Sequence, residues 1–262
     1  MNFVKTAAEI KRIRQSSRIL ANTLRRLESM AHPGVDLRDL EAFARAAIKE
    51  HGGKPAFLGY RPTGAGSPFP FALCTSLNEV IVHGVPRPYK LKEGDILKLD
   101  LGVNWKEGIS DSALTVPVGK ISKEDAHLIE LTREALAKGI AQARPGKMTG
   151  DIGHAIESTV TKGGGYIVDG LSGHGVGNAL HEEPSIFNYG TPGEGVPLVP
   201  GIIIAIEPMI SLTTSKVDQL DDDSYVTADG SNSAHFEHTV LITEKGNEVL
   251  TKRSSSERSR GE

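Results

Sequence analysis

An internal repeat constrains the fold of this chain more than any other feature of its sequence. Residues 31–53 (AHPGVDLRDLEAFARAAIKEHGG) and 143–165 (ARPGKMTGDIGHAIESTVTKGGG) align at a constant offset of 112 residues. Both segments open on a Pro-Gly turn, continue as an amphipathic run and close on glycines, and each follows another amphipathic run. A repeat this long indicates duplication rather than a solenoid. We therefore expect two similar halves, about 1–120 and 121–251, each a helix pair followed by strands.

Helix signals flank both copies of the repeat. Apolar residues recur at three- and four-residue steps from Ile10 to Leu27, which predicts one amphipathic helix. Asp36 is a good N-cap for the next helix, with Val35 and Leu40 as a hydrophobic staple, and Ser122 caps the matching helix of the second half. The outer face of the first helix is basic, which favours a solvated surface over one that binds an anionic partner. Its cations are Lys11, Arg12, Arg14, Arg18, Arg25 and Arg26.

Strand-like segments follow each helix pair. They are β-branched or alternating runs bounded by Gly, Pro or polar residues, and they cover residues 72–84, 95–103, 109–118, 201–210, 224–230 and 235–243. Short turns between them predict a mostly antiparallel, curved sheet backed by helices, which is an α+β fold. We expect residues 1–251 to form a single domain and the polar residues 252–262 to be a disordered tail.

Composition excludes several classes of protein. A formal net charge of −3 gives no electrostatic case for nucleic acid as the main partner. No apolar run approaches the roughly 18 residues that a membrane span needs, and the first ten residues lack the apolar core of a signal peptide. The single cysteine, Cys74, excludes an intrachain disulfide and fits a reducing compartment. We therefore predict a cytoplasmic protein, in which the acidic run 221–223 is a solvated loop.

Two aspartates in apolar strand-like segments are the first candidate functional residues. Asp100 and Asp111 flank the turn NWKEG, and a hairpin centred between Trp105 and Lys106 places them directly opposite each other on one face. Two buried carboxylates at such a distance repel each other and are costly to desolvate. A cation must compensate them: either Lys98, which shares the face of Asp100, or, as the stronger candidate, a divalent metal ion.

Two glutamates extend this argument. Glu207 ends the apolar run IIIAIEP, and Glu237 lies in the strand-like segment HFEHTVLIT. Any one of these four acids alone would more often be a surface or paired residue, but together they indicate a shared cation site. Four carboxylates match two divalent ions, and oxygen-rich ligation with one or two histidines suits Mn, Fe, Co or Zn. Two such ions about 3.5–4 Å apart would bridge a water molecule and lower its pKa toward neutral.

The stretch SGHGVGNALHEEP carries two histidines among glycines. This stretch has three interpretations: a phosphate loop, a metal site or a plain turn. The sequence GHGVGN fails the last position of G-x-G-x-x-G, and no P-loop lysine follows it, which weakens the first. We predict that His174 is the nitrogen ligand, with its flanking glycines allowing close backbone approach. His181 is either a second ligand or, as we prefer, a substrate contact.

These segments resemble those of a known family. CTSLNEVIVHGVP, LDLGVNWKEGISDS, GHGVGNALHEEP, IIIAIEPMI and SAHFEHTVLIT look like the signature segments of type I methionine aminopeptidases. The resemblance runs from about Phe3 to Thr251. It implies the pita-bread fold, a pseudo-twofold α/β structure that agrees with the repeat, and it favours the short bacterial form.

The resemblance also implies a role for each site residue. Asp100 would chelate one metal ion, His174 and Glu207 would bind the other, and Asp111 and Glu237 would bridge both. A bridging water or hydroxide would attack the carbonyl group after an N-terminal methionine, with Glu207 helping to move its proton. His181 would then stabilise the oxyanion, and His83 would contact the backbone nitrogen beside the scissile bond, although a structural turn histidine is the alternative for His83.

The methionine pocket is where this chain departs from the family pattern. The resemblance implies a pocket lined by Phe57, Tyr60, Cys74, Leu180, Met209 and His235. Phe57 stands where the family often has cysteine, Leu180 replaces a common phenylalanine and His235 replaces the usual glutamine. Asp223 falls near the position of a tryptophan that caps the pocket in many relatives, and the connection after Tyr60 is longer than usual. We expect an apolar pocket of altered shape.

Three functions remain to be compared. The first is a dinuclear-metal aminopeptidase that removes initiator methionine from nascent proteins, acting as a monomer and meeting its substrates near the ribosome. The second is another pita-bread peptidase of the X-Pro type, which usually carries a further N-terminal domain. The third is a binding module of the same fold, which would be expected to have lost metal ligands.

Overall fold

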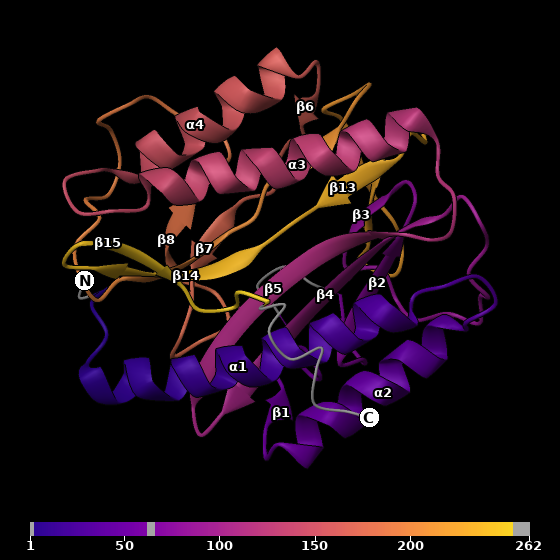
Figure 1. The fold of residues 1–262 in the computed structure, drawn as a ribbon, viewed down its shortest axis with the longest axis horizontal. Helices are drawn as coiled ribbons and strands as arrows, with labels where there is room; N and C mark the ends of the chain where they lie inside the picture. The colour runs from indigo at the N-terminus through magenta and orange to yellow at the C-terminus, as the bar shows by residue number, and fades with distance from the viewer. Residues whose placement is uncertain (1–2, 62–65, 254–262) are drawn as a thin grey trace, which may run out of the picture.

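The computed structural model describes residues 3–61 and 66–253, which form a layered α/β structure (Figure 1). Four helices and fifteen strands lie within these residues. The helices are α1 (Ala7–Met30), α2 (Leu37–Glu50), α3 (Lys123–Gln142) and α4 (Thr149–Lys162). The longest strands, β4 (Ile96–Trp105) and β5 (Gly108–Pro117), form one hairpin. None of the helices in the described ranges is both long and apolar enough to cross a membrane.

The remaining strands are short and fall into two sets. The first half contributes β1 (Lys54–Pro55), β2 (Leu73–Leu77) and β3 (Val80–Val82). The second half contributes β6 (Tyr166–Ile167), β7 (Gly173–Gly175), β8 (Glu182–Ile186), β9 (Ile203–Ile206), β10 (Met209–Ser211), β11 (Val217–Gln219), β12 (Tyr225–Thr227), β13 (Ser233–His235), β14 (His238–Thr243) and β15 (Gly246–Val249).

The helix pairs repeat with the offset found in the sequence. The helices α2 and α4 have the same length of 14 residues, and both their starts and their ends differ by 112 positions. Gly34 and its counterpart Gly146 both adopt positive φ, at 93° and 83°. The Pro-Gly turn therefore needs glycine in each copy, because other residues rarely adopt this conformation. Asp36 and Ser122 cap their helices as predicted.

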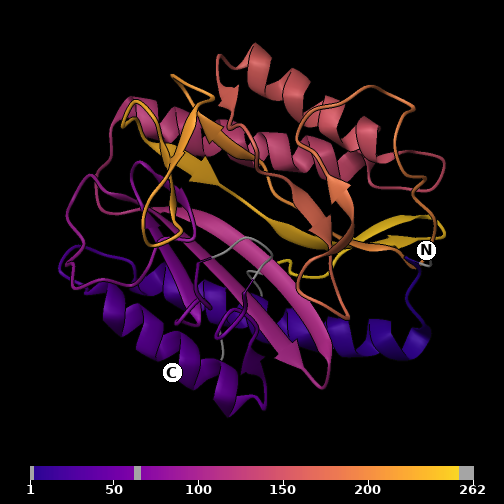
Figure 2. The ribbon, with the colours of Figure 1, turned by 180° about the vertical axis from the view of Figure 1, so that it is seen from behind.

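Two antiparallel sheets hold most of the strands. One contains β1, β2, β4 and β5, and the other runs in the order β15-β14-β9-β7-β8. Every pairing between named strands is antiparallel, in agreement with the prediction. Helix α1 packs on β4 and β5, whereas α3 packs on β9, β10 and β13. Seen from behind, the strands and long loops lie between the two helix pairs (Figure 2).

The predicted register of the β4–β5 hairpin is wrong by two residues, because the centre of the turn lies one residue further along the chain. Trp105 pairs with Gly108, so the loop is Lys106-Glu107, and both loop residues have positive φ. Such a loop matches the right-handed twist of the strands. Trp105 stays in the strand because its ring packs against the main hydrophobic core. Asp100 therefore faces Ala113, and Asp111 faces Gly102.

The two aspartates nevertheless share one face of the hairpin. Asp100 and Gly102 are two residues apart on β4, and side chains alternate between faces along a strand. Asp100 and Asp111 are thus diagonal neighbours rather than direct partners. The qualitative prediction of two carboxylates on one face holds, although its geometric basis was incorrect.

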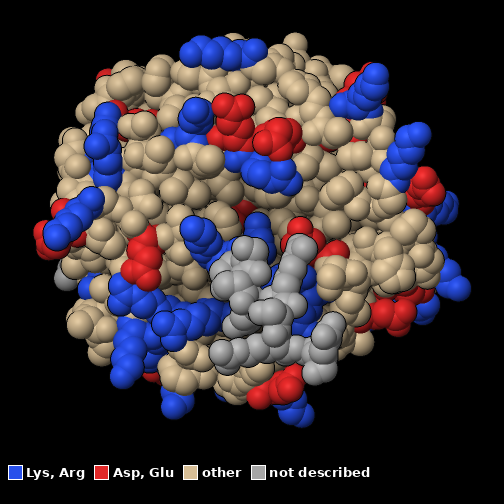
Figure 3. Space-filling view, in the orientation of Figure 1, with Lys and Arg blue, Asp and Glu red and all other residues tan. Residues whose placement is uncertain are grey.

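The surface carries charges of both signs. In the view of Figure 3, Lys and Arg side chains gather over the part of this face where α1 lies, with Asp and Glu among them. Arg14 of the basic helix face forms an ion pair with Glu248, with 2.6 Å between Nη2 and Oε2. Of the predicted tail, Lys252 and Arg253 are described, and Arg253 donates to Ser112 Oγ at 3.5 Å. Residues 254–262 lie outside the described residues.

Candidate metal centre and its pocket

Four carboxylates and one imidazole converge between the two halves. Donor atoms of Asp100, Asp111 and Glu237 all lie within 4.8 Å of one another, and so do those of His174, Glu207 and Glu237. Glu237 belongs to both groups and therefore joins them. The structure brings together all five ligands that the sequence predicted.

Breaks between strands position the two glutamates. Glu207 and Pro208 separate β9 from β10, and Phe236 and Glu237 separate β13 from β14. Pro208 cannot donate a ladder hydrogen bond, which interrupts the strand that the sequence predicted to be continuous. The Glu237 N–H instead donates to Ala113 O of β5 at 3.0 Å. The irregular backbone thus directs Glu207 and Glu237 toward the hairpin that carries the aspartates.

A threonine joins the two halves at the same place. Asp111 N–H donates to Thr239 Oγ1 at 3.0 Å, and the Thr239 hydroxyl donates to Asp111 O at 2.7 Å. One side chain of β14 therefore completes both backbone hydrogen bonds of Asp111. This link fixes β5 of the first half against β14 of the second.

The carboxylates are strongly perturbed in the absence of a cation. Desolvation raises the pKa of Asp100 to about 7 and that of Glu207 to about 8. Desolvation, followed by the charges of the neighbouring acids, raises the pKa values of Asp111 and Glu237 well above their usual range. Burial thus favours the protonated, neutral form of each of these carboxyl groups unless a cation lies beside it.

The unpaired oxygens of this cluster fit a metal ion. Asp100 Oδ1, Asp111 Oδ1 and Glu237 Oε1 are buried and have no hydrogen-bond partner among the described residues. Buried carboxylate oxygens normally have a polar partner, so this arrangement fits ligation of a metal ion. The alternative prediction, that Lys98 compensates the aspartates, is wrong. The Lys98 Nζ donates to Asn78 O and to Ser233 O and Oγ rather than to an aspartate.

His174 is oriented as a metal ligand. It lies on β7, and its Nδ1 is 2.9 Å from Gly175 O, so that Nδ1–H donates and Nε2 keeps its lone pair. Nε2 lies 3.4 Å from Glu207 Oε1. Burial lowers the pKa of His174 to about 4, which keeps the ring neutral at pH 7.

The glycines beside His174 allow the predicted close approach of the backbone. A Cβ atom at Gly173 would lie 2.3 Å from Ala205 O, and one at Gly175 would lie 2.3 Å from Glu183 O. Both contacts are with main-chain oxygens of the neighbouring strands, β9 and β8. Only glycine therefore lets β7 fit between β8 and β9.

His181 lies beside His174 and faces the same cluster. The two rings pack edge to face with centroids 4.3 Å apart, and donor atoms of Asp111, His174 and His181 lie within 4.8 Å of one another. Tyr60 Oη is 2.8 Å from His181 Nδ1. Desolvation, followed by the neighbouring His174, lowers the pKa of His181, so the ring is neutral at pH 7.

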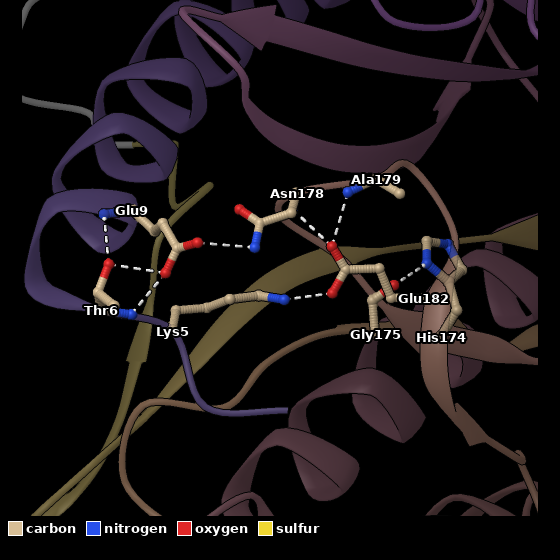
Figure 4. A network of polar contacts seen from close by, with 8 residues as sticks. All are labelled: Lys5, Thr6, Glu9, His174, Gly175, Asn178, Ala179 and Glu182. Carbon is tan, nitrogen blue, oxygen red and sulfur yellow. Dashed lines mark hydrogen bonds and ion pairs between the residues drawn. The ribbon is translucent and has the colours of Figure 1, made fainter. Parts of the chain in front are cut away.

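The loop that carries His181 is anchored to the N-terminal segment (Figure 4). Lys5 Nζ forms an ion pair with Glu182, whose Oε1 accepts the N–H groups of Asn178 and Ala179 at 2.5 and 2.6 Å. Asn178 Nδ2 donates to Glu9 of α1 at 2.8 Å. The sequence interpretation missed this network, because nothing in the sequence relates Lys5 to Glu182.

A pocket of about 600 Å³ opens over the candidate metal ligands. Phe57, Tyr60, Cys74, His83, Leu180, His181 and Met209 line it, as predicted. His83 has φ 61° and packs edge to face on Tyr225, and burial lowers its pKa. Asp222 and Asp223 both line the pocket, and Asp223 Oδ2 accepts Gly66 N–H at 3.1 Å. Asp221 and Asp222 are exposed.

His235 occupies a different place from the one expected. It is not among the described residues that line the pocket, and only 1% of it is exposed. Its Nε2 lies 3.4 Å from Glu207 Oε2, on the side opposite the oxygen that faces His174. His235 therefore lies behind Glu207 rather than against a substrate side chain.

Some pocket residues had no clear sequence signal. Phe69, Leu171 and Val82 also line the cavity. Phe69 comes from the long connection after Tyr60, where the alternation of Phe and Pro was the one available sign of a packed loop. Cys74 is buried, and desolvation raises the pKa of its thiol well above the usual range, so it is a wall residue rather than a nucleophile.

Comparisons with known proteins agree with this geometry. The model of metallopeptidase family M24 matches residues 11–244. Methionine aminopeptidase 1 of Bacillus subtilis is 41% identical over 253 residues, which cover 96% of this chain and 100% of that protein. The crystal structure of a methionine aminopeptidase from Thermotoga maritima superposes with a TM-score of 0.90 at 42% identity, covering 95% of this chain and 98% of the other.

A more distant structure shares the fold alone. Prolidase from Pyrococcus furiosus superposes with a TM-score of 0.76 at 24% identity, and the match covers 96% of this chain but 66% of the prolidase. The pita-bread architecture expected from the sequence is therefore confirmed, and the X-Pro peptidases are the less similar group. The chain belongs to metallopeptidase family M24 and, within it, to the methionine aminopeptidases.

Proposed function

We propose that this protein removes the initiator methionine from peptides and nascent proteins by hydrolysing their first peptide bond. The observation that carries this proposal is the pair of donor groups sharing Glu237 in a pocket that also has apolar walls. A substrate side chain in the pocket would bring the following peptide bond next to these donors. The named activity of the Bacillus subtilis relative supports the choice of methionine.

Five residues would hold two divalent ions. Asp100 would bind one, His174 and Glu207 the other, and Asp111 and Glu237 would bridge them. The unpaired oxygens of Asp100, Asp111 and Glu237 and the lone pair on His174 Nε2 support their assignment as ligands. A donor set rich in oxygen with one imidazole suits Mn, Fe, Co or Zn. When bound, such ions supply an activated water molecule near neutral pH and polarise the substrate carbonyl group.

Side chains of the protein would transfer protons and stabilise the charge that develops during hydrolysis. Glu207 lies at the junction of the cluster and the pocket, where its carboxylate can accept a proton from water and pass it to the leaving amine. Neutral His181 would donate a hydrogen bond to the carbonyl oxygen as negative charge develops there. His83, which also lines the pocket, would contact the backbone nitrogen beside the scissile bond.

The pocket would select an unbranched apolar side chain. Phe57, Tyr60, Cys74, Leu180 and Met209 provide its apolar walls, and the thioether of methionine packs well against aromatic rings. Asp223 at the rim would lie outside the space for the methionine side chain. We propose a preference for small second residues, since the next side chain would meet the crowded metal ligands.

The proposal extends to the domain organisation, oligomeric state and cellular location of the protein. Residues 1–251 would act as one catalytic domain, because donors from both helix–strand repeats form a single site. The buried, unpaired Cys74 suits a reducing compartment. We therefore propose a monomeric cytoplasmic enzyme that meets nascent chains near the ribosome.

A steady-state peptide assay tests the proposal. The protein is stripped with a chelator, reloaded with Mn or Co, and given Met-Ala-Ser, Ala-Ala-Ser and Ala-Pro-Ser. We expect metal-dependent cleavage of Met-Ala-Ser with a clear preference over the other two. Preferred cleavage of Ala-Pro-Ser would assign the protein to X-Pro chemistry, and no cleavage with any metal would support the binding-module alternative.

A further inference from the structure

Lys98 is a lysine fully enclosed in the protein next to the metal centre. Its side chain has 0% exposure and heads the set of largest fully buried side chains. Within the described residues it forms no ion pair with a carboxylate. Its Nζ donates instead to Asn78 O at 2.5 Å, to Ser233 O at 3.0 Å and to Ser233 Oγ at 3.3 Å. A buried ammonium group costs several kcal/mol unless polar groups replace its water, so these oxygens are its compensation.

The oxygens around Lys98 come from both halves of the chain. Asn78 lies in the turn between β2 and β3, and its own amide is fixed by Asp95 and by the Ile96 N–H. Ser233 begins β13 of the second half, and its N–H donates to the same Asn78 O at 3.1 Å. Lys98 thus connects β4, on which it lies, with a rigid turn of the first half and with a strand of the second.

Each strand that Lys98 joins leads directly to a metal ligand. Asp100 follows Lys98 by two residues on β4, and Glu237 follows Ser233 by four. Between them lies His235, whose N–H and C=O are both bonded to the Thr115 hydroxyl at 2.9 Å and whose Nε2 faces Glu207. The position of β13 against β4 therefore sets the separation between ligands supplied by the two halves.

We propose that Lys98 is a positioning residue of the metal centre: a tethered internal cation that clamps β13 to the first half and so sets the spacing of Asp100 and Glu237. Lys98 touches neither substrate nor metal ion in this role. This inference rests on the proposed metal centre.

The test measures metal binding rather than activity alone. Wild-type protein, Lys98→Met and Lys98→Gln are stripped of metal and titrated with Mn²⁺ by calorimetry. Methionine matches the length of lysine without donors, and glutamine keeps N–H donors without the charge. We expect about a 10-fold or greater weakening of Mn²⁺ binding in both variants, as for other residues that orient metal ligands without binding the metal. If Lys98→Met does not fold, Lys98→Gln still tests the proposal.

A stability control separates positioning from a general loss of packing. Leu24 of α1 is fully buried in the core, and Leu24→Ala removes stability without touching the clamp. We expect this variant to bind Mn²⁺ with wild-type affinity at temperatures where it is folded. Equal weakening in Leu24→Ala and Lys98→Met would overturn the proposal, because the effect would then follow stability alone.

Chemical rescue provides a readout that a merely structural lysine would not give. Lys98→Ala leaves space for a small cation between the three oxygens, so methylammonium should restore part of the Mn²⁺ affinity, whereas tetramethylammonium at equal ionic strength should not. Wild-type affinity in Lys98→Met or Lys98→Gln, or equal effects of the two salts, would contradict the clamp. If the wild-type protein itself binds no pair of Mn²⁺ ions, the proposed function fails instead.

Discussion

The hydroxyl of Tyr60 lies 2.8 Å from Nδ1 of His181, across an edge-to-face contact of the two rings. A hydroxyl that donates to Nδ1 fixes the ring proton on Nε2. The Nε2–H group is then the donor available to a substrate oxygen. We infer that the Tyr60 hydroxyl is the donor, so that Tyr60 both lines the pocket and sets the tautomer of the residue proposed to stabilise the oxyanion.

Replacing this tyrosine tests that relationship. Tyr60→Phe keeps the ring and removes the hydrogen bond, which is worth about 1 kcal/mol, so kcat for Met-Ala-Ser should fall about 5-fold. Metal affinity should not change, because Tyr60 is not a ligand. Tyr225→Phe, which removes a hydroxyl from the ring that packs on His83, serves as the control. An unchanged kcat in Tyr60→Phe would show that the bond does not matter for catalysis.

Metal binding and oxyanion stabilisation should separate in two variants. Asp111→Asn removes a charge from the centre of the cluster, so both Mn²⁺ binding and turnover should collapse. His181→Ala should retain metal while kcat falls about 10²–10³-fold, as expected for a lost oxyanion donor. Calorimetry and the peptide assay report the two quantities independently. Wild-type turnover in both variants would be incompatible with these roles.

The acidic cluster predicts an unusual dependence of stability on pH. In the folded, metal-free protein the pKa values of Asp100 and Glu207 are raised to about 7 and about 8, from 3.8 and 4.5. The stabilisation from their protonated forms is complete below the unfolded values and is lost as the pH rises through 7 and 8. The melting temperature of metal-free protein should therefore fall between about pH 5 and pH 8, by several °C, since about 1 kcal/mol corresponds to roughly 2–4 °C at this size.

Two further measurements identify the cause of this fall. Saturating Mn²⁺ at pH 8 should restore the melting temperature, because it binds the deprotonated carboxylates. Asp100→Asn removes one of the titrating groups and should flatten the slope of metal-free protein. A melting temperature that rises with pH over this range would mean that the carboxylates are not held protonated in the folded state.

The packing around His174 gives a prediction about the backbone. A Cβ at position 173 would meet Ala205 O at 2.3 Å, so Gly173→Ala should displace β7 from β9 and lower the free energy of unfolding by about 1–3 kcal/mol. It should also weaken metal binding, because His174 moves with the strand. In the control Gly66→Ala the new Cβ has 3.5 Å to its nearest neighbour and should change little. Denaturant unfolding measures both variants, and equal stability would exclude the steric account.

The sequence predicted the helices well because their signals are local. Asp36 and Ser122 cap the helices that they were expected to cap, and the offset of 112 residues recurs in the boundaries of α2 and α4. Very short strands such as Lys54–Pro55 and Tyr166–Ile167 were not predicted, because two residues carry no periodicity and form a strand only through a partner. The hairpin register depended on the packing of Trp105, which is a tertiary interaction.

The same contrast between local signals and tertiary interactions applies to the residues of the site. Carboxylates inside apolar strands are costly unless compensated, so Asp100, Asp111, Glu207 and Glu237 stood out from sequence alone. The wall of the pocket gave no such signal: His235 was assigned to it by resemblance, yet lies behind Glu207. Lys98 shares the face of Asp100 as expected, but its partners on Asn78 and Ser233 belong to segments that only the folded chain brings together.

Anomalous diffraction from crystals of the Mn²⁺-loaded protein tests the central claim most directly. The account predicts two anomalous peaks about 3.5–4 Å apart, as in other two-metal sites, enclosed by Asp100, Asp111, His174, Glu207 and Glu237. A single peak, or peaks that lie away from these five side chains, would contradict it.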